Sequence, residues 1–402
     1  MEKIKLAVAG LGSRGFGLLK NAILPSGQAD ICALCDPDHE KHERAAALVS
    51  EYSTDRPALF SDCREMTVRP DAMLVATDWT SHAGIAVWCM ENGIASLIEV
   101  GGAASVGECE RLVETYRRTG TPLMFAENCC FGKDETLAAS MAAAGIFGDI
   151  VHCSGAYAHD LREYLLGKPA RDSFRLEYAR RHNCDYYPTH ELGPIAKILG
   201  LNRGNRMVSL VSVASRPAGL ADYARRSEDP EAIRLTGNII QGDIVNTVIT
   251  CENGETVSLR LDTSLPRFYS RELTVRGTRG LFEAATGLVF LDGDEPGKDT
   301  PDSYRKFSGT AERYYDRFLP AEWKTADTGS GHGGMDGLMV REFFRSLRDG
   351  DEMPIDVYDM AAWSAVSCLS EESVARGGAP VAVPDFTMGE YRTRRPRSAL
   401  RS

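Results

Sequence analysis

The feature that most constrains this fold is a strand, a glycine loop and a helix that follow one another at the start of the chain. The run IKLAVAG, from Ile4 to Gly10, is short and mainly apolar, as a strand buried on both faces of a parallel sheet must be. It leads into GLGSRG, where Gly10, Gly12 and Gly15 have the G-x-G-x-x-G spacing. The first glycine permits a tight turn, the second lets the backbone approach a pyrophosphate, and the third lets the helix pack closely. A helical pattern follows from about Ser13 to Asn21, so the order of elements predicts a dinucleotide site.

The second expected strand indicates which dinucleotide binds. ADICALCD ends in Asp36, at about the distance of 20 residues that the motif requires. A carboxylate there accepts hydrogen bonds from both ribose hydroxyls and repels a 2'-phosphate, so NAD is expected rather than NADP. Cys32 and Cys35 form a C-x-x-C in this strand, but positions i and i+3 point to opposite faces, so we expect them only to pack.

Strands and helices continue to alternate up to residue 128. DAMLVAT, ASLIEV and PLMFAEN read as strands, and SHAGIAVWCMENG and VGECERLVETYRRTG have helical spacing. The pattern predicts an α/β domain over residues 1–128 with a Rossmann-type doubly wound parallel sheet. Ligands bind beyond the carboxyl ends of such strands, so the polar residues there should converge on one cleft. These residues are Asp36, Thr77 to Trp79, Glu99 to Val100, and Glu127 to Asn128.

From about Ile150 the pattern changes to longer alternating runs, among them DIVHCSGAYAH and RMVSLVSVAS. Two further runs flank Asn253-Gly254, which is a strong hairpin signal. We therefore expect a C-terminal α+β domain over residues 129–390, with a largely antiparallel open sheet and few helices. A late helix is expected from Ala361 to Arg376, and a long loop or lid from Asp292 to Gly331.

Charge and composition exclude several classes of partner. The net charge of -11 argues against nucleic acid, and no apolar run reaches the roughly 18 residues of a membrane span. The basic run RTRRPRSALRS predicts a flexible tail over 391–402. A strand begins almost at once, which leaves no room for an export signal, and the eleven cysteines are odd in number. We expect reduced thiols and a cytoplasmic protein.

The stretch YYPTHELGP precedes a segment, Ile195 to Leu199, that reads as a helix. His190 would then lie at the helix N-terminus, where the dipole disfavours an added positive charge, so a neutral base is expected. A purely structural reading is equally open. In that reading Thr189 caps the helix, Pro194 sits in its first turn, and His190 is a hydrogen-bonded core residue.

Several motifs occur together in one order: IEV, AENCCFG, AYAHDLR, YPTH, DTSLPRFYSR and GHGGMDG. With the glycine loop and Asp36, they make the chain resemble the Gfo/Idh/MocA oxidoreductase superfamily. More narrowly, it resembles the NAD-dependent glycosidase branch, whose founding activity is α-N-acetylgalactosaminidase. The similarity runs from Lys3 to about Phe386.

The resemblance implies a redox-assisted hydrolysis of glycosides. Tightly bound NAD oxidises the sugar C3 hydroxyl, which acidifies the C2 proton; a base removes that proton, and the aglycone leaves by elimination. Water then adds, and the hydride returns to C3. Such a reaction needs a base near C2 rather than the carboxylate pair of other glycosidases. The second domain of such proteins often pairs with another subunit, so a homo-oligomer is expected.

The resemblance also implies site residues, which we carry over motif by motif. The expected acid–base and catalytic residues are His190, Tyr187, Tyr157 and Tyr269. The expected substrate-binding residues are Arg175, Glu127, Thr189, Glu191 and His332. The expected cofactor-binding residues are Gly10, Gly12, Ser13, Arg14, Gly15, Asp36, Thr77, Trp79, His82, Glu99, Val100 and Asn128.

Two departures from family patterns qualify the resemblance. Ordinary dehydrogenases of the superfamily carry Glu-Lys-Pro where this chain has Glu99-Val100-Gly101, and valine cannot exchange a proton. The glycosidase branch also lacks that lysine. Founding members of the branch have glycine after the histidine, where this chain has Glu191, which leaves the substrate open. His159, Asp160, His190 and Glu191 have no diagnostic metal-binding spacing, so no metal is expected.

Two alternatives remain beside the glycosidase. A net NAD-dependent sugar or polyol dehydrogenase would use His190 in place of the missing lysine. A non-catalytic NAD-binding sensor would bind the cofactor without turning over any glycoside.

Overall fold

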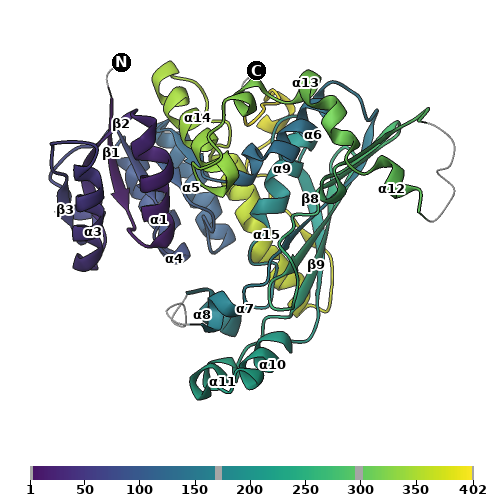
Figure 1. The fold of residues 1–402 in the computed structure, drawn as a ribbon, viewed down its shortest axis with the longest axis horizontal. Helices are drawn as coiled ribbons and strands as arrows, with labels where there is room; N and C mark the ends of the chain where they lie inside the picture. The colour runs from purple at the N-terminus through teal and green to yellow at the C-terminus, as the bar shows by residue number, and fades with distance from the viewer. Residues whose placement is uncertain (1–2, 168–173, 295–301, 401–402) are drawn as a thin grey trace. The chain divides into compact units, whose positions relative to one another are not determined.

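The computed structural model describes residues 3–167, 174–294 and 302–400, and the chain forms two compact units (Figure 1). Unit 1 contains Met1–Gly132, Pro320–Ser364 and Ser398–Ser402. Unit 2 contains Lys133–Leu319 and Ala365–Arg397. The first change of unit follows Gly132, and no sequence pattern predicted that residues 320–364 belong to unit 1.

Unit 1 is built on a parallel sheet of six strands in the order β3-β2-β1-β4-β5-β6. The strands are β1 (Ile4–Ala9), β2 (Ala29–Cys35), β3 (Ala58–Phe60), β4 (Ala72–Val75), β5 (Ala95–Ile98) and β6 (Leu123–Phe125). Strands β4 and β5 are buried along their whole length, as strands covered on both faces must be. The strand order reverses between β1 and β4, which places the ligand crevice at their carboxyl ends. The doubly wound parallel sheet is confirmed.

One long helix of unit 1 was not expected. The helical segments are α1 (Ser13–Leu18), the π-helical η1 (Leu19–Ile23), α2 (Leu24–Ser26), α3 (His39–Ser50), η2 (Cys63–Glu65), α4 (Trp79–Glu91), α5 (Val106–Thr119), η3 (Asn128–Phe131), η7 (Ala321–Lys324), η8 (His332–Gly334) and α14 (Met335–Asp349). Helix α14 packs against η1 and η3, which joins it to unit 1. It starts after Gly334 without a side-chain cap, so the usual sequence signal for a helix start is missing.

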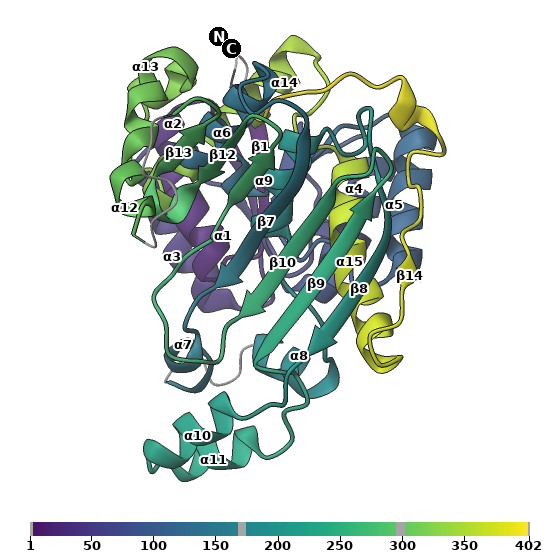
Figure 2. The ribbon, with the colours of Figure 1, turned by 90° about the vertical axis from the view of Figure 1, so that its right-hand side faces the viewer.

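Unit 2 contains an eight-stranded sheet in the order β13-β12-β11-β7-β10-β9-β8-β14, and β7, β10, β9 and β8 run across the centre of Figure 2. The strands are β7 (Ile150–Ala158), β8 (Met207–Ala214), β9 (Ile244–Cys251), β10 (Thr256–Asp262), β11 (Thr274–Gly277), β12 (Gly280–Glu283), β13 (Leu288–Leu291) and β14 (Val381–Ala382). Every pairing is antiparallel except that of β7 with β10. The expected hairpin joins β9 to β10 through Gly254, at φ 97°. The largely antiparallel sheet is confirmed.

The expectation of few helices in the second domain is wrong. Unit 2 contains α6 (Lys133–Ala143), α7 (Arg162–Leu166), α8 (Phe174–Arg181), α9 (Thr189–Leu199), α10 (Gly219–Arg226), α11 (Pro230–Thr236), η5 (Ala284–Thr286), α12 (Tyr304–Phe307), η6 (Thr310–Tyr314), α13 (Tyr315–Phe318) and η9 (Glu390–Arg392). Most are too short to produce a clear helical period in the sequence. Several interrupt the expected loop over 292–331, of which residues 295–301 lie outside the described part. The late helix is α15 (Val357–Ala375), and the division between the units falls within it.

The C-terminal segment is not the solvated tail that its basic residues suggested. Tyr391, Ala399 and Leu400 are buried, and the Tyr391 hydroxyl donates a hydrogen bond to Glu252 at 3.2 Å. Burial of these apolar groups outweighs the tendency of the neighbouring arginines to remain in water. Residues 401–402 of this segment lie outside the described part.

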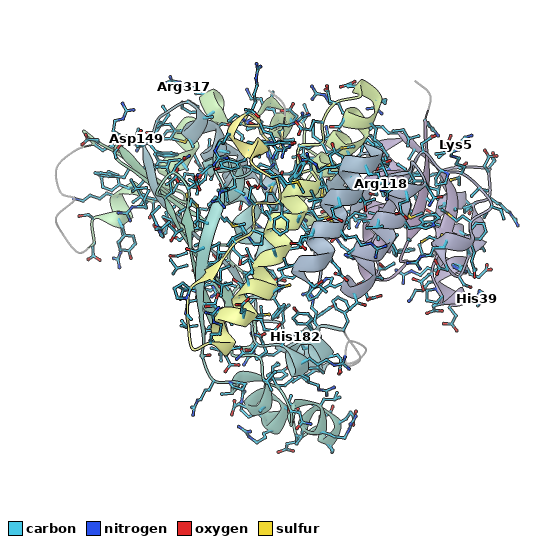
Figure 3. All side chains as sticks on the ribbon, turned by 180° about the vertical axis from the view of Figure 1, so that it is seen from behind. Lys5, His39, Arg118, Asp149, His182 and Arg317 are labelled. Atoms are coloured by element: carbon cyan, nitrogen blue, oxygen red, sulfur yellow. The ribbon has the colours of Figure 1, made fainter. Side chains whose placement is uncertain are left out.

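Charged side chains such as Arg118, Asp149 and Arg317 are exposed (Figure 3). All eleven cysteines are free thiols, and Cys35 is buried within β2, in line with a packing role. Among the described residues, no helix has both the length and the apolar character that crossing a bilayer requires.

Candidate active site

The three glycines of the loop after β1 occupy three different environments in unit 1. Gly10 has φ 90°, and a Cβ there would lie 2.4 Å from the Ala76 carbonyl oxygen. A Cβ on Gly15 would lie 1.9 Å from the Gly10 carbonyl oxygen, so only glycine fits both positions. A Cβ on Gly12 would meet no protein atom within 4 Å. The loop is therefore close-packed on its inner side and open at Gly12, a shape that fits a dinucleotide pyrophosphate.

Asp36 joins the end of β2 to the glycine loop. Its Oδ2 accepts a hydrogen bond from the Leu11 backbone N–H at 2.8 Å, and its Oδ1 accepts one from Asp38 N–H at 3.0 Å. Lys41 Nζ lies 3.3 Å from Oδ1. The carboxylate expected to meet the ribose thus also fixes the loop that would hold the pyrophosphate.

Arg14, in the first turn of α1, is held by two carboxylates. Its Nε donates to Glu99 Oε1 at 2.8 Å, while Nη1 and Nη2 donate to the two oxygens of Asp336 at 2.7 and 3.0 Å. Asp336 also accepts a hydrogen bond from Asn128 Nδ2 at 2.8 Å. Burial opposes ionisation of Asp336, but hydrogen bonding with His332 and the charge of Arg14 hold its pKa well below the ordinary value. Sequence reasoning missed Asp336, although it lies within the GHGGMDG motif.

His332, which was expected to contact substrate, lies beside Asp336 and Arg14 in unit 1. Its Nδ1 lies 2.8 Å from Asp336 Oδ2 and 3.2 Å from Arg14 Nη1.

His82 is buried, and its Nε2 lies 3.1 Å from the Thr77 carbonyl oxygen. Burial lowers the pKa of His82 to about 4, so it is neutral near pH 7.

Val100, another expected cofactor residue, follows the end of β5, and the side chain of Trp79 packs on its neighbour Gly101. Trp79 begins α4, and its ring packs so closely on Gly101 that a Cβ there would lie 2.1 Å from it. Val100 N–H donates to Glu99 Oε2 at 3.2 Å.

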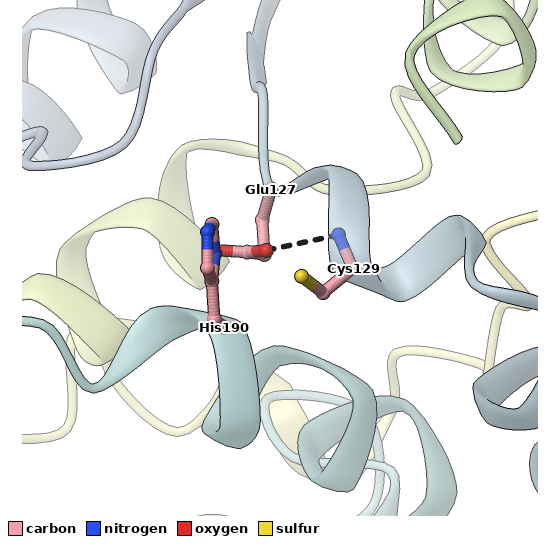
Figure 4. A group of neighbouring side chains, drawn as sticks. All are labelled: Glu127, Cys129 and His190. Carbon is pink, nitrogen blue, oxygen red and sulfur yellow. Dashed lines mark hydrogen bonds between the residues drawn. The ribbon is translucent and has the colours of Figure 1, made fainter. Parts of the chain in front are cut away.

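At the end of β6, the buried Glu127 accepts a hydrogen bond from Cys129 N–H at 3.0 Å and caps η3 (Figure 4).

In unit 2 the structure brings together three of the four expected catalytic side chains. Tyr157 lies on β7, Tyr187 precedes α9, and His190 is the second residue of α9. The ring centroids of the two tyrosines are 4.4 Å apart, and His190 lies 4.8 Å from Tyr187 and 5.4 Å from Tyr157. Both phenols and the imidazole therefore form one cluster, which we call the aromatic cluster.

His159, which was not among the expected catalytic residues, connects Tyr269 to the aromatic cluster. Its Nδ1 lies 3.5 Å from the Tyr157 hydroxyl, and its ring centroid lies 5.1 Å from that of Tyr269. Burial and the positive charge of Arg175 lower the pKa of His159. Tyr269 accepts a hydrogen bond from Arg271 Nη1 at 3.2 Å. Neither His159 nor Arg271 has a local sequence signal for this role.

Arg175 lies over the ring of Tyr187, with its guanidinium carbon 4.8 Å from the ring centroid. Burial alone would lower the pKa of Arg175, but Tyr187, Tyr157 and Tyr186 raise it above the ordinary value. The side chain therefore stays charged beside the phenols. Asp160, once considered with His159 as a metal ligand, is instead bound by Arg162 Nε and Nη2 at 2.8 and 2.6 Å.

The helix that carries His190 begins earlier than expected, at Thr189. Its N-cap is Pro188, without a side-chain cap, so the expectation that Thr189 caps the helix is wrong. Pro194 lies inside the helix rather than in its first turn, and it lacks the N–H that would bond the His190 carbonyl. Thr189 and Glu191 are both buried on this helix.

Two family models match the chain, one for the NAD-binding part and one for the glycosyl hydrolase part. Residues 4–127 match the oxidoreductase family with an NAD-binding Rossmann fold. Residues 131–393 match the C-terminal domain of glycosyl hydrolase 109.

Curated relatives match almost the whole chain. A glycosyl hydrolase family 109 protein of Shewanella woodyi is 34% identical, with 98% of this chain and 87% of the relative covered. A protein of Shewanella oneidensis named alpha-N-acetylgalactosaminidase is 32% identical, with 98% and 88% covered.

Solved structures show the same fold at lower identity. Levoglucosan dehydrogenase in complex with NADH aligns with a TM-score of 0.72 at 19% identity, covering 96% of this chain and 100% of that one. An oxidoreductase of Agrobacterium radiobacter in complex with NAD+, L-tartaric acid and magnesium aligns with a TM-score of 0.67 at 15% identity, covering 96% and 99%. Since the relatives match over nearly their full length and the glycosyl hydrolase model covers most of the chain, this protein is an NAD-binding member of glycosyl hydrolase family 109.

Proposed function

We propose that this protein hydrolyses a small glycoside through transient oxidation at the sugar C3, and that N-acetylgalactosaminides are the first substrates to test. The observation that carries the proposal is the aromatic cluster of Tyr157, Tyr187 and His190. Its groups can give and take protons without a carboxylate pair, as an elimination mechanism requires.

NAD, held by the glycine loop and Asp36, would supply a hydride acceptor for the sugar C3 and would return the hydride to that carbon. His190 removes the C2 proton, because its imidazole is half-buried at the start of α9 and its ring centroid lies 4.8 Å from that of Tyr187. Tyr187 protonates the departing glycosidic oxygen. Tyr157 and Tyr269 hold sugar hydroxyls, and Arg175 fixes the sugar while it orients the Tyr187 ring.

We assign the cofactor to the carboxyl edge of the sheet in unit 1. The open backbone at Gly12 and the adjacent Ser13 hold the pyrophosphate, and Asp36 holds the ribose. Arg14 and Glu99 shape the loop and the strand end next to it. Glu127, Glu191 and Thr189 are further proposed substrate contacts, and all three are buried.

The test uses protein purified without added cofactor. One portion is denatured to measure released NAD, and the rest is incubated with aryl α- and β-glycosides, including N-acetylgalactosaminides. We expect stoichiometric NAD, release of aglycone, and no net rise in NADH absorbance. NADH that accumulates in proportion to substrate would instead identify a net dehydrogenase. NAD binding without any turnover would identify a sensor.

We also propose a homo-oligomer in the cytoplasm. Val213 on β8 and Val248 on β9 are exposed apolar side chains on neighbouring strands, which suits contact with a second copy. Light scattering coupled to gel filtration would test the oligomer, with a monomer mass as the contrary result. The free thiols suit a reducing compartment, which cell fractionation would test.

A further inference from the structure

The segment from Ser330 to Asp336, which we call the strap, has an unusual backbone. Gly331, Gly333 and Gly334 have φ values of 91°, 67° and 103°, and His332 has φ 45°. A histidine in the left-handed region persists only where its surroundings favour that conformation. A Cβ on Gly331 would lie 2.5 Å from Asp336 Oδ2, so the strap is folded tightly around the Asp336 carboxylate.

Asp336 connects the strap to the carboxyl edge of the parallel sheet. It accepts two hydrogen bonds from Arg14 in the glycine loop, one from Asn128 after β6, and it lies 2.8 Å from His332 in the strap itself. Through Arg14 it is also connected to Glu99 after β5. One carboxylate therefore joins three loops that surround the expected cofactor crevice within unit 1.

The bonds to Arg14 leave its guanidinium little capacity for a phosphate. Nε is directed at Glu99 and both terminal nitrogens at Asp336, and the two carboxylates have side-chain exposures of only 7% and 4%. Charge-assisted bonds of this kind are among the strongest in proteins. Arg14 therefore affects the cofactor by fixing the loop, and the strap depends on the same bonds.

We propose that Asp336 is a positioning residue for NAD, which holds the strap against the glycine loop and thereby slows exchange of the bound cofactor. The inference depends on NAD binding and not on the proposed hydrolysis. Its physical basis is that NAD at this edge can enter and leave freely only when the strap is displaced, and displacement breaks the ionic bonds of Asp336.

The test is the rate at which bound NAD exchanges for isotopically labelled NAD in the purified holoenzyme, followed by mass spectrometry. Asp336→Asn keeps the shape of the side chain but removes its charge, and we expect NAD exchange to become roughly 10- to 100-fold faster. The matched control is Glu342→Gln. Glu342 is a buried acid further along α14, paired with Arg345 at 3.2 Å, and its loss should leave exchange unchanged.

Gly331→Ala provides a second variant that retains every charge. Its new methyl group would push the Asp336 carboxylate away from Arg14, so exchange should accelerate here too. If Asp336→Asn does not fold, Gly331→Ala decides the question. Exchange at the wild-type rate in the folded variants, or equal acceleration in Glu342→Gln, would overturn the proposal. Aglycone release at saturating NAD is measured in parallel, so that failure of the hydrolase proposal is seen separately.

Discussion

The cofactor edge of unit 1 and the aromatic cluster of unit 2 are built from opposite kinds of chemistry. At the cofactor edge, Arg14 is held between Glu99 and Asp336 by short ionic hydrogen bonds. In the aromatic cluster, Tyr157, Tyr187 and His190 meet through ring contacts. Ion pairs hold a loop in one geometry, whereas phenol and imidazole groups can exchange protons. The proposed division, with a ligand held in unit 1 and acid–base chemistry in unit 2, rests on this difference.

The largest expected effect tests this division of labour. His190→Ala should lower aglycone release by roughly 100- to 10,000-fold because it removes the base, while bound NAD stays at the wild-type level. The control is His182→Ala, since His182 pairs with Glu371 elsewhere in unit 2 and should leave turnover nearly unchanged. Full activity in His190→Ala would show that another group takes the proton.

The units should also differ in how pH affects stability, beginning with Asp185 in unit 2. Burial raises the pKa of Asp185 to about 7, against about 3.9 in an unfolded chain. The unfolded state therefore ionises first, and stability falls as pH rises from about 4 to about 7. Between about pH 5 and about pH 8, the free energy of unfolding should fall by roughly 2 to 3 kcal/mol less in Asp185→Asn than in the wild type. Urea unfolding of both proteins measures it, and identical pH profiles would refute the assignment.

His82 in unit 1 should give the opposite sign. Burial lowers its pKa to about 4, against about 6.5 in an unfolded chain. The unfolded state therefore binds the proton first, and stability falls as pH drops from about 6.5 to about 4. Both proteins are measured without NAD. Between about pH 8 and about pH 5, the free energy of unfolding should fall by roughly 2 kcal/mol less in His82→Gln than in the wild type. A variant as acid-sensitive as wild type would contradict this.

The smallest effect concerns shape alone. A methyl group at Gly12 meets no protein atom, so Gly12→Ala should fold normally but weaken NAD binding by roughly 10- to 100-fold, because it fills the space left for the pyrophosphate. Gly17→Ala is the control, since Gly17 also has open space but lies beyond the loop. Binding and thermal unfolding are measured together. Unchanged NAD affinity in Gly12→Ala would show that the pyrophosphate does not bind next to Gly12.

The sequence predicted elements well where local signals were strong. The glycine loop has a fixed spacing, and Gly254 marks the hairpin between β9 and β10, so both were read correctly. Helix α14 was missed because it begins after Gly334 without a side-chain cap. Pro194 was expected in the first turn of α9, but that helix begins at Thr189 and Pro194 lies inside it.

Site residues were predictable where their contacts lie close together in the sequence, and not where they join distant segments. The spacing of the glycines and of Asp36 reflects contacts between close neighbours in the chain. Asp336 could not be paired with Arg14 from sequence, because 322 positions separate them. His159 was likewise given no role in the expected site, since only the fold places it between Tyr157 and Tyr269.

The sequence by itself determined the doubly wound sheet, the open antiparallel sheet and the choice of NAD, because short-range sterics, alternation of apolar residues and glycine geometry are local properties. Only the tertiary structure decided that α14 joins unit 1, that Asp336 binds Arg14, and that His159 completes the aromatic cluster. These contacts depend on how distant segments pack, and packing of distant segments leaves no fixed spacing in the chain.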